Sequence, residues 1–172
     1  MCAVVQSAQC VSPVETPKVF TLLVGSAMEI RTTRFGTVEI DAADVIAFPG
    51  GMPGLEGSFN WVLLADAEND ALGWLQSTAR SDLALAVVSP RRFVPDYQVR
   101  VARAELAPLA LDQVHDAQVL VIVNKHEQSI TLNLKAPLII NLQSRLGRQV
   151  VSNGDYPIQH ELCQPTPRKK IA

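Results

Sequence analysis

Short apolar segments are interrupted by Gly, Pro, Asn and Asp at intervals of about ten residues along most of this chain. Such spacing is typical of an antiparallel barrel or sandwich. The candidate strands are Glu29–Arg34, Val38–Asp41, Trp61–Ala65, Gly73–Gln76, Leu83–Ser89, Ala117–Asn124, Ile130–Asn133, Leu138–Gln143 and Gln149–Ser152. The pattern predicts a mainly β fold: a small antiparallel, β-barrel-like single domain with at most one or two short helices.

Four segments add detail to this prediction. Arg34–Thr37 has the composition of a hairpin turn. Phe48–Leu55 must be a shaped loop, because its prolines lack backbone donors and its glycines permit positive φ. Val119–Val123 is apolar at successive positions, which indicates a strand covered on both faces. A helix is expected within Ala102–Leu111, kept short by its internal proline.

The 172 residues suffice for one domain with its own core, and a hydrophobic content of 48% argues against global disorder. Residues 1–27 mix small, polar and proline residues, and we expect an extension there, with Met28 as a candidate natural start. The domain is expected to span residues 28–162. Residues 163–172 are proline-rich and basic, as in a flexible tail.

The compartment is predicted from cysteines and hydropathy. Cys2, Cys10 and Cys163 are an odd number without repeated spacing, so they give no disulfide framework and favour a reducing compartment. No apolar run reaches the roughly 18 residues needed to span a bilayer, and no basic segment of a secretory signal follows Met1. We therefore expect a soluble, cytoplasmic protein.

The net charge of −2 conceals an asymmetry along the chain. Between Met28 and Asp82 there are 9 acidic residues and 3 basic ones, whereas basic residues are in excess from Leu83 onward. If the acids share one face, they would repel nucleic acid and steer a basic protein toward it. The alternative is an ordinary solvated surface.

Sequence signatures of catalysis and metal binding are missing. His115, His126 and His160 are far apart, and no HxH, HxxxH or CxxC pair occurs. GxSxG, GxxxxGK[ST] and GxGxxG are also absent, and the glycines of Gly50–Gly54 lack the lysine of a phosphate loop. We therefore predict a protein that is not an enzyme, with no catalytic residue, cofactor or metal.

Two alternatives remain open at this point. Arg91-Arg92-Phe93 with Tyr97 nearby could serve a small barrel that binds RNA directly, because single strands are held by basic residues and stacking aromatics. The other alternative is an enzyme that uses a histidine and carboxylate pair.

Several sequence blocks, taken in order, resemble the flagellar assembly factor family known as FliW. The blocks are Thr33–Ile40, Asp44–Glu56, Trp61–Leu64, Trp74–Ser77, Phe93–Tyr97, Thr131–Asn141, Arg145–Val150 and Tyr156–His160. The resemblance covers about residues 28–162. It implies a β-barrel-like cytoplasmic protein, without cofactor or catalysis, that binds flagellin and, alternatively, the carbon storage regulator CsrA, an RNA-binding translational repressor.

The same resemblance implies a regulatory circuit. When flagellin is secreted, the freed factor captures the regulator and relieves its repression of flagellin translation. The factor is expected to be a monomer when free, with neither nucleic acid nor membrane among its partners. The regulator is basic where it holds RNA, which the acids between Glu39 and Asp82 complement, and flagellin would contribute an amphipathic helix that needs an apolar groove.

Candidate contact residues lie in the loop Gly50–Glu56, among the acids, and in two of the blocks above. They are Asp41, Asp44, Met52, Leu55, Glu56, Asp66, Phe93, Pro95, Asp96, Tyr97, Asn133, Lys135 and Pro137. Each has a structural alternative. Pro and Gly shape turns, Asn133 can satisfy buried backbone groups, and Phe93 and Tyr97 can belong to the core.

Overall fold

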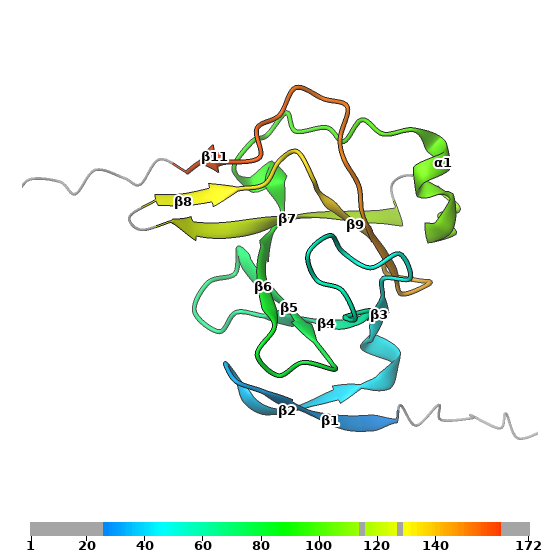
Figure 1. The fold of residues 1–172 in the computed structure, drawn as a ribbon, viewed down its shortest axis with the longest axis vertical. Coiled ribbons are helices and arrows are strands. Elements are labelled where there is room, and N and C mark those ends of the chain that lie inside the picture. The colour runs from blue at the N-terminus through cyan, green and yellow to red at the C-terminus, as the bar shows by residue number, and fades with distance from the viewer. Residues whose placement is uncertain (1–25, 114–115, 127–128, 163–172) are drawn as a thin grey trace, which may run out of the picture.

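The structure is a computed structural model that describes residues 26–113, 116–126 and 129–162 (Figure 1). The strands are β1 Ala27–Thr32, β2 Gly36–Asp41, β3 Ile46–Ala47, β4 Asn60–Ala65, β5 Leu72–Ser77, β6 Ala84–Val88, β7 Ala117–His126, β8 Ser129–Leu132, β9 Leu138–Asn141, β10 Leu146–Gln149 and β11 His160–Glu161. The helical turns are η1 Ala42–Asp44, η2 Pro90–Arg92, α1 Arg103–Leu106 and η3 Ala107–Leu109. The expected extension before residue 26 and the tail after Leu162 lie outside the described residues.

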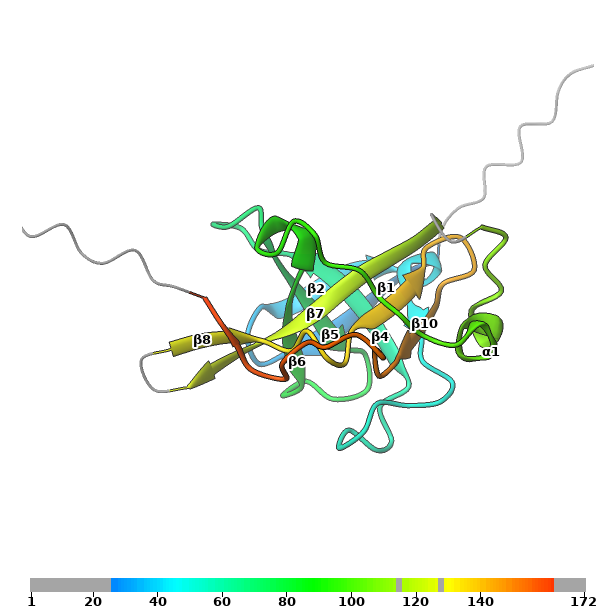
Figure 2. The same cartoon turned by 90° about the horizontal axis from the view of Figure 1, so that it is seen from above.

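Seven strands close into a ring. Their order is β7-β6-β5-β4-β3-β10-β9, and β9 also pairs with β7, which completes the circle. The long strand β7 crosses the ring obliquely and extends beyond it to pair with β8, which in turn pairs with β11 (Figure 2). Every pairing is antiparallel except that of β10 with β3, at Leu146 and Ala47. The predicted mainly β, barrel-like fold is confirmed.

The ring is filled by apolar side chains from the surrounding strands and from the loop after β3. This cluster comprises Ile46, Phe48, Met52, Trp61, Leu75, Val87, Leu120, Leu138 and Ile140. Phe48 and Trp61 meet edge to face, with ring centroids 6.5 Å apart. Phe48 fits only because β10 carries Gly147 beneath it: a Cβ at Gly147 would lie closer than 3.0 Å to three Phe48 ring atoms.

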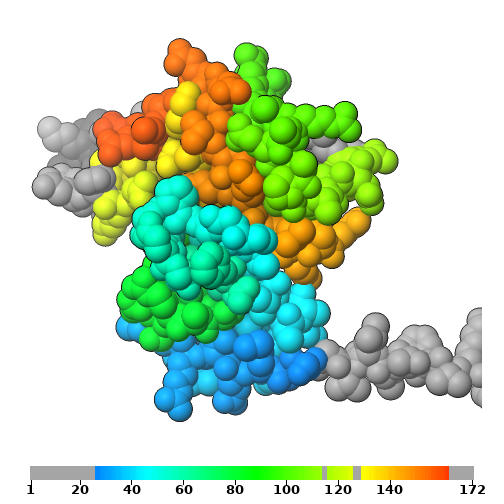
Figure 3. Space-filling view, turned by 45° about the vertical axis from the view of Figure 1, so that its right-hand side comes forward, coloured from blue at the N-terminus to red at the C-terminus, as the bar shows by residue number. Residues whose placement is uncertain are grey.

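The two-stranded β1–β2 ribbon covers the outer face of the ring at one end of the molecule, and β11 lies at the other end (Figures 1 and 3). Ile30 and Ile40 are buried against Val62 of β4. At the tip of the ribbon, the Arg34 guanidinium lies 3.7 Å from the ring centroid of Trp74, a cation–π contact. The ribbon is therefore fixed to the ring and presents its other face to solvent.

The helix expected within Ala102–Leu111 is short, as predicted. It consists of α1, a single turn, followed by η3 with Pro108 in its first turn. The proline has no N–H to continue the α-helical ladder, so the chain tightens into a 3-10 turn there.

The strand predicted at Gln149–Ser152 was wrong, because the strand in this region is Leu146–Gln149. Its ladder with β9 ends at the pair Gln149–Leu138. The next partner is Pro137, which accepts a bond from the Val150 N–H but has no N–H to return. The two-residue strands β3 and β11 were not predicted.

Candidate protein-binding surfaces

The solvent-facing side of the β1–β2 ribbon carries Glu29, Glu39 and Asp41, which we call the acidic ribbon face, and one base, Arg31. Ile30 and Ile40 are buried, so the side chains that alternate with them point outward. The register places Glu29 directly opposite Glu39. Two carboxylates thus stand side by side on an exposed surface.

This pairing does not serve the fold. Neither the Glu29 nor the Glu39 side chain has a hydrogen bond or ion pair with another residue that the structure describes. Like charges directly opposite each other across a strand pair destabilise it, by about 0.2–1 kcal/mol. A cationic partner would remove that repulsion, so the acidic ribbon face fits a basic surface.

Three of the predicted contact acids have local partners. Asp44 accepts a bond from the Arg145 guanidinium at 2.9 Å, in an exposed ion pair. Asp41 accepts from the Ala43 N–H and Glu56 accepts from the Gly54 N–H. These carboxylates shape turns, yet Asp44 and Glu56 remain exposed and Asp41 half-exposed.

Asp66 is the most constrained of the predicted acids. One carboxyl oxygen accepts from the Trp74 indole N–H at 2.8 Å, and the other accepts from the backbone N–H groups of Glu68 and Asn69. The indole bond chiefly lowers the pKa of Asp66, assisted by the backbone donors and the Arg34 charge. Asp66 therefore joins the β4–β5 turn to the ribbon tip through Trp74.

The loop Gly50–Glu56 is only partly exposed. Met52 is buried in the ring, so its assignment as a surface contact is corrected: it anchors the loop from beneath. Leu55 is half-buried against the same cluster. Beside the loop, Phe59 leaves half of its surface in solvent.

Tyr97 is also buried, with 2% of its surface exposed, so it cannot contact a partner directly. Its hydroxyl donates to the Leu134 carbonyl at 2.7 Å, and its ring lies 4.7 Å from that of Tyr156. Burial, with a smaller contribution from Tyr156, raises the pKa of Tyr97 to about 12. The residue holds Phe93–Tyr97 against the turn after β8, which brings two of the predicted blocks together.

We predict that Tyr97→Phe destabilises the fold by about 1–3 kcal/mol at pH 7, because the Leu134 carbonyl loses its partner in the interior. The native pKa is raised, so this stabilisation is complete below pH 10 and is lost as pH rises toward about 12. Urea unfolding of both proteins at pH 7 and pH 11 measures the difference. The difference in unfolding free energy between the two proteins should be smaller at pH 11 than at pH 7. An equal difference at both pH values would show that the Tyr97 hydroxyl does not contribute this stability.

The other candidate contact residues in Phe93–Tyr97 lie at the surface. Phe93, Pro95 and Asp96 are exposed, and Phe93 shows 39% of its surface. They stay predictions as contacts. Of the two aromatic residues in this segment, only Phe93 is available for RNA bases to stack on, because Tyr97 is buried.

The turn after β8 is built by its own side chains. Asn133 accepts from the Ala136 N–H, and the Lys135 ammonium donates to the Gly154 carbonyl at 2.9 Å. Pro137 is buried. Asn133 thus satisfies local backbone, and Lys135 and Pro137 fix the C-terminal segment to the ring.

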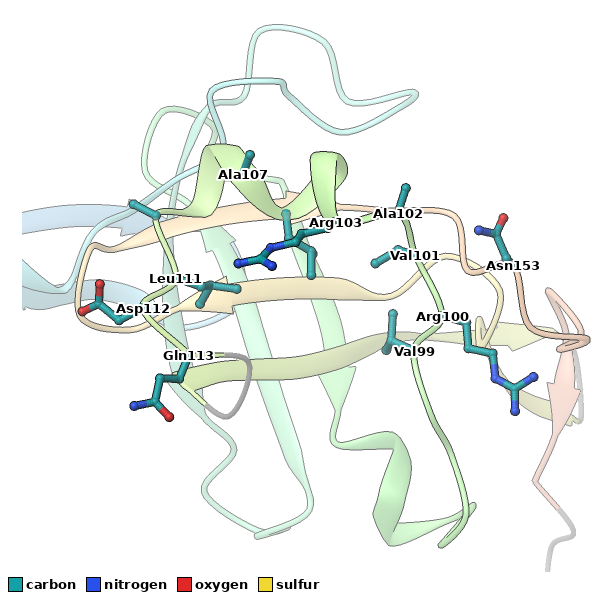
Figure 4. Close-up of a pocket in the computed structure, with 12 residues that line it drawn as sticks. Val99, Arg100, Val101, Ala102, Arg103, Ala107, Leu111, Asp112, Gln113 and Asn153 are labelled. Atoms are coloured by element: carbon teal, nitrogen blue, oxygen red, sulfur yellow. The ribbon is translucent and has the colours of Figure 1, made fainter.

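A groove that the sequence did not reveal lies between the extended segment before α1 and the segment after η3 (Figure 4). Its volume is about 930 Å³, and we call it the α1 groove. Its lining residues are Val99, Arg100, Val101, Ala102, Arg103, Leu106, Ala107, Ala110, Leu111, Asp112, Gln113 and Asn153. Val101, Leu106 and Leu111 line it with apolar surface, and the exposed Arg100 and Arg103 make its rim largely basic.

One wall of the α1 groove is strained. Ala110 adopts the left-handed conformation, φ 49° and ψ 44°, where Cβ is crowded. We predict that Ala110→Gly stabilises the fold by about 1 kcal/mol. The matched control is Ala107→Gly, since Ala107 is equally exposed but helical at φ −52°, and glycine there costs about 1 kcal/mol. The thermal unfolding midpoint should rise for Ala110→Gly and fall for Ala107→Gly. Equal shifts in the two variants would show that the backbone of Ala110 is not strained.

The histidines add no site in the described part of the chain. His160 pairs with Leu132 through the β11–β8 ladder, whereas His115 lies outside the described residues. Among described residues, no three His, Cys, Asp or Glu side chains gather in a group able to hold a metal ion. No helix in the described ranges has both the length and the apolar character to cross a membrane.

Comparison with known proteins gives the same result by three routes. Residues 29–162 match the family model described as FliW protein. The flagellar assembly factor FliW of Desulfitobacterium hafniense strain Y51 is 35% identical over 138 residues, covering 78% of this chain and 91% of the relative. That of Caldanaerobacter subterraneus subsp. tengcongensis is 37% identical over 141 residues, covering 80% and 94%.

A solved structure agrees with the sequence matches. The crystal structure of a flagellar assembly factor FliW superposes with a TM-score of 0.73 at 30% identity, covering 80% of this chain and 98% of that one. The overall fold is therefore shared with a solved flagellar assembly factor FliW. This chain belongs to the FliW family of flagellar assembly factors.

Proposed function

We propose that this protein is a cytoplasmic flagellar assembly factor that binds flagellin and, alternatively, the carbon storage regulator CsrA. Captured regulator no longer represses flagellin translation, so synthesis is coupled to secretion. The observation that carries the proposal is the family match across residues 29–162, together with the fold shared with a solved FliW. The protein is a monomer when free.

The acidic ribbon face is the surface that fits the regulator best. A surface that holds RNA is basic, and Glu29, Glu39 and Asp41 offer it three carboxylates on a rigid ribbon. Asp44 lies in the helical turn that directly follows the ribbon, but its charge is paired with that of Arg145, so it adds little to this face. Binding there is electrostatic and weakens with salt.

The α1 groove is the surface that fits an amphipathic flagellin helix. Val101, Leu106 and Leu111 provide the apolar contact that such a helix needs. Arg100 and Arg103 at its rim select acidic residues beside the apolar stripe. The two partners thus have different primary surfaces, and their alternative binding requires that one bound partner sterically excludes the other.

Calorimetry with purified flagellin and purified regulator from the same organism tests the proposal. Binding of each at micromolar affinity or tighter, near −8 kcal/mol, is the expected result. The absence of heat with both partners would mean that this chain has the family's fold without its function.

A further inference from the structure

Strand β7 is paired along both of its ends on one side but only at its centre on the other. On the first side, Ala117–Leu120 pair with β9 and Val123–His126 pair with β8. On the second side, only Val121 and Ile122 are paired, with β6. The chain leaves β6 for η2 at Pro90, which has no N–H to extend the ladder. Residues 117–120 therefore leave a strand edge open among the described residues.

A slot of about 700 Å³ separates this open edge from the segment that precedes α1. We call it the β7 slot, and it shares Val99 with the α1 groove. Its lining residues are Ser89, Pro90, Arg91, Tyr97, Gln98, Val99, Ala117, Gln118 and Val119. Its two long walls are thus β7 on one side and residues 97–99 on the other, and Arg100 and Val101 continue the second wall toward α1 (Figure 4).

The second wall also has unused backbone groups. The Arg100 N–H donates to the Ser152 hydroxyl at 3.2 Å, and the Arg100 carbonyl accepts from the Asn153 N–H at 2.6 Å. In an extended chain, the backbone groups of the neighbouring residues point to the opposite side. Those groups of Val99 and Val101 have no partner among the described residues.

The charge and hydrophobicity of the lining residues limit the class of ligand that the β7 slot can bind. Arg91 lines the slot and Arg100 flanks it; both are exposed and neither has an ion pair with a described residue. The slot's lining includes no Asp or Glu, and Val99 and Val119 are apolar. Phosphates of RNA would match the arginines but leave the strand edge and the valines unmatched, which disfavours a nucleic acid.

We propose that the β7 slot binds an extended, acidic segment of a protein partner, which adds as a strand to the open edge of β7. Its backbone pairs with residues 117–120 and with Val99 and Val101, its acidic side chains face Arg91 and Arg100, and its apolar side chains cover Val99 and Val119. The inference goes beyond the proposed function and takes from it only that the partner is a protein. Strand addition differs from the helix docking proposed for the α1 groove.

The test uses a synthetic peptide of about six residues, the usual strand length, that alternates valine with aspartate or glutamate. Amide exchange followed by NMR should slow about tenfold at Val99, Val101 and those amides of residues 117–120 that face away from β9 when peptide is added to about 1 mM. The same peptide N-methylated at all of its valines has equal charge but cannot donate hydrogen bonds along one edge. Equal binding of both peptides, or no protection at these amides, would overturn the proposal.

Two double variants of the protein distinguish peptide binding in the β7 slot from a general effect of net charge. Arg91→Glu combined with Arg100→Glu should weaken the peptide about tenfold or more. Lys125→Glu with Arg31→Glu makes the same charge change at exposed positions away from the slot and should have little effect. If a single-stranded oligouridine binds and the peptide does not, the slot is a nucleic-acid site and the inference is wrong.

Natural partners distinguish this inference from the proposed function. Flagellin and the regulator are each added to the labelled protein, and the same amides are followed. Protection at residues 117–120 identifies the strand donor. Binding of either partner, with those amides unprotected and the peptide inactive, would leave the proposed function standing and refute strand addition.

Discussion

Gly147→Ala is expected to destabilise this protein by about 3 kcal/mol or more, the upper end for overpacking a core. The added methyl would lie closer than 3.0 Å to three atoms of the Phe48 ring. Phe48 is fully buried and meets Trp61 edge to face, so the ring has no free space to move into. The free energy of unfolding of a domain is about 5–15 kcal/mol, so this single methyl group could remove enough of it to unfold part of the protein at 37 °C.

The clash can be isolated by a double-mutant cycle. Phe48→Leu shortens the side chain above Gly147, so the double variant should be more stable than the sum of the single changes predicts, by about 1–3 kcal/mol. Gly50→Ala is the control, since its Cβ would meet nothing within 4 Å. Additive single effects in denaturant unfolding would show that the contact between Phe48 and Gly147 does not limit the ring.

Reversing both glutamates of the acidic ribbon face, with Glu29→Lys and Glu39→Lys, should weaken regulator binding by about 30- to 100-fold. The change replaces two attractions with two repulsions, about 2–3 kcal/mol in total, and each 1.4 kcal/mol is a factor of ten. Flagellin binding should remain within about threefold, because its proposed groove is separate. Titration calorimetry of each partner at low and at physiological salt measures both effects.

A matched control separates local charge from net charge. Asp155→Lys with Glu161→Lys makes the same total change at exposed positions, and Glu161 lies on β11, at the opposite end of the molecule (Figure 1). This variant should retain regulator affinity apart from a small long-range effect. Equal losses of regulator affinity in the two double variants would show that the regulator does not bind at the acidic ribbon face.

Sequence reasoning recovered the elements whose signals are local. Alternation in Val38–Asp41 and the turn at Gly36 predict the ribbon, and five successive apolar residues in Val119–Val123 predict a strand at the centre of the fold. Closure of the ring is not local. It depends on β7 pairing with β9 on one side and β6 on the other, a choice that follows from tertiary contacts. Two-residue strands such as β3 carry too few residues for a pattern.

The site was predicted less well than the fold. Met52 and Tyr97 lie in loops beside Gly and Pro, where a large side chain that anchors the loop and one that contacts a partner have the same sequence signal. Glu29 and Glu39 were visible as charges, but their opposition requires the strand register. The α1 groove combines residues that look like an ordinary short helix and its flanks, so nothing in the sequence indicated it.

The most direct test of the central claim is a three-component binding measurement. Fluorescently labelled RNA from the flagellin messenger leader is first bound to the regulator, and its anisotropy is followed. Adding this protein should release the RNA, and adding flagellin should then restore the RNA complex, because the two proteins compete for this one. RNA that stays on the regulator at every concentration of this protein would contradict the claim.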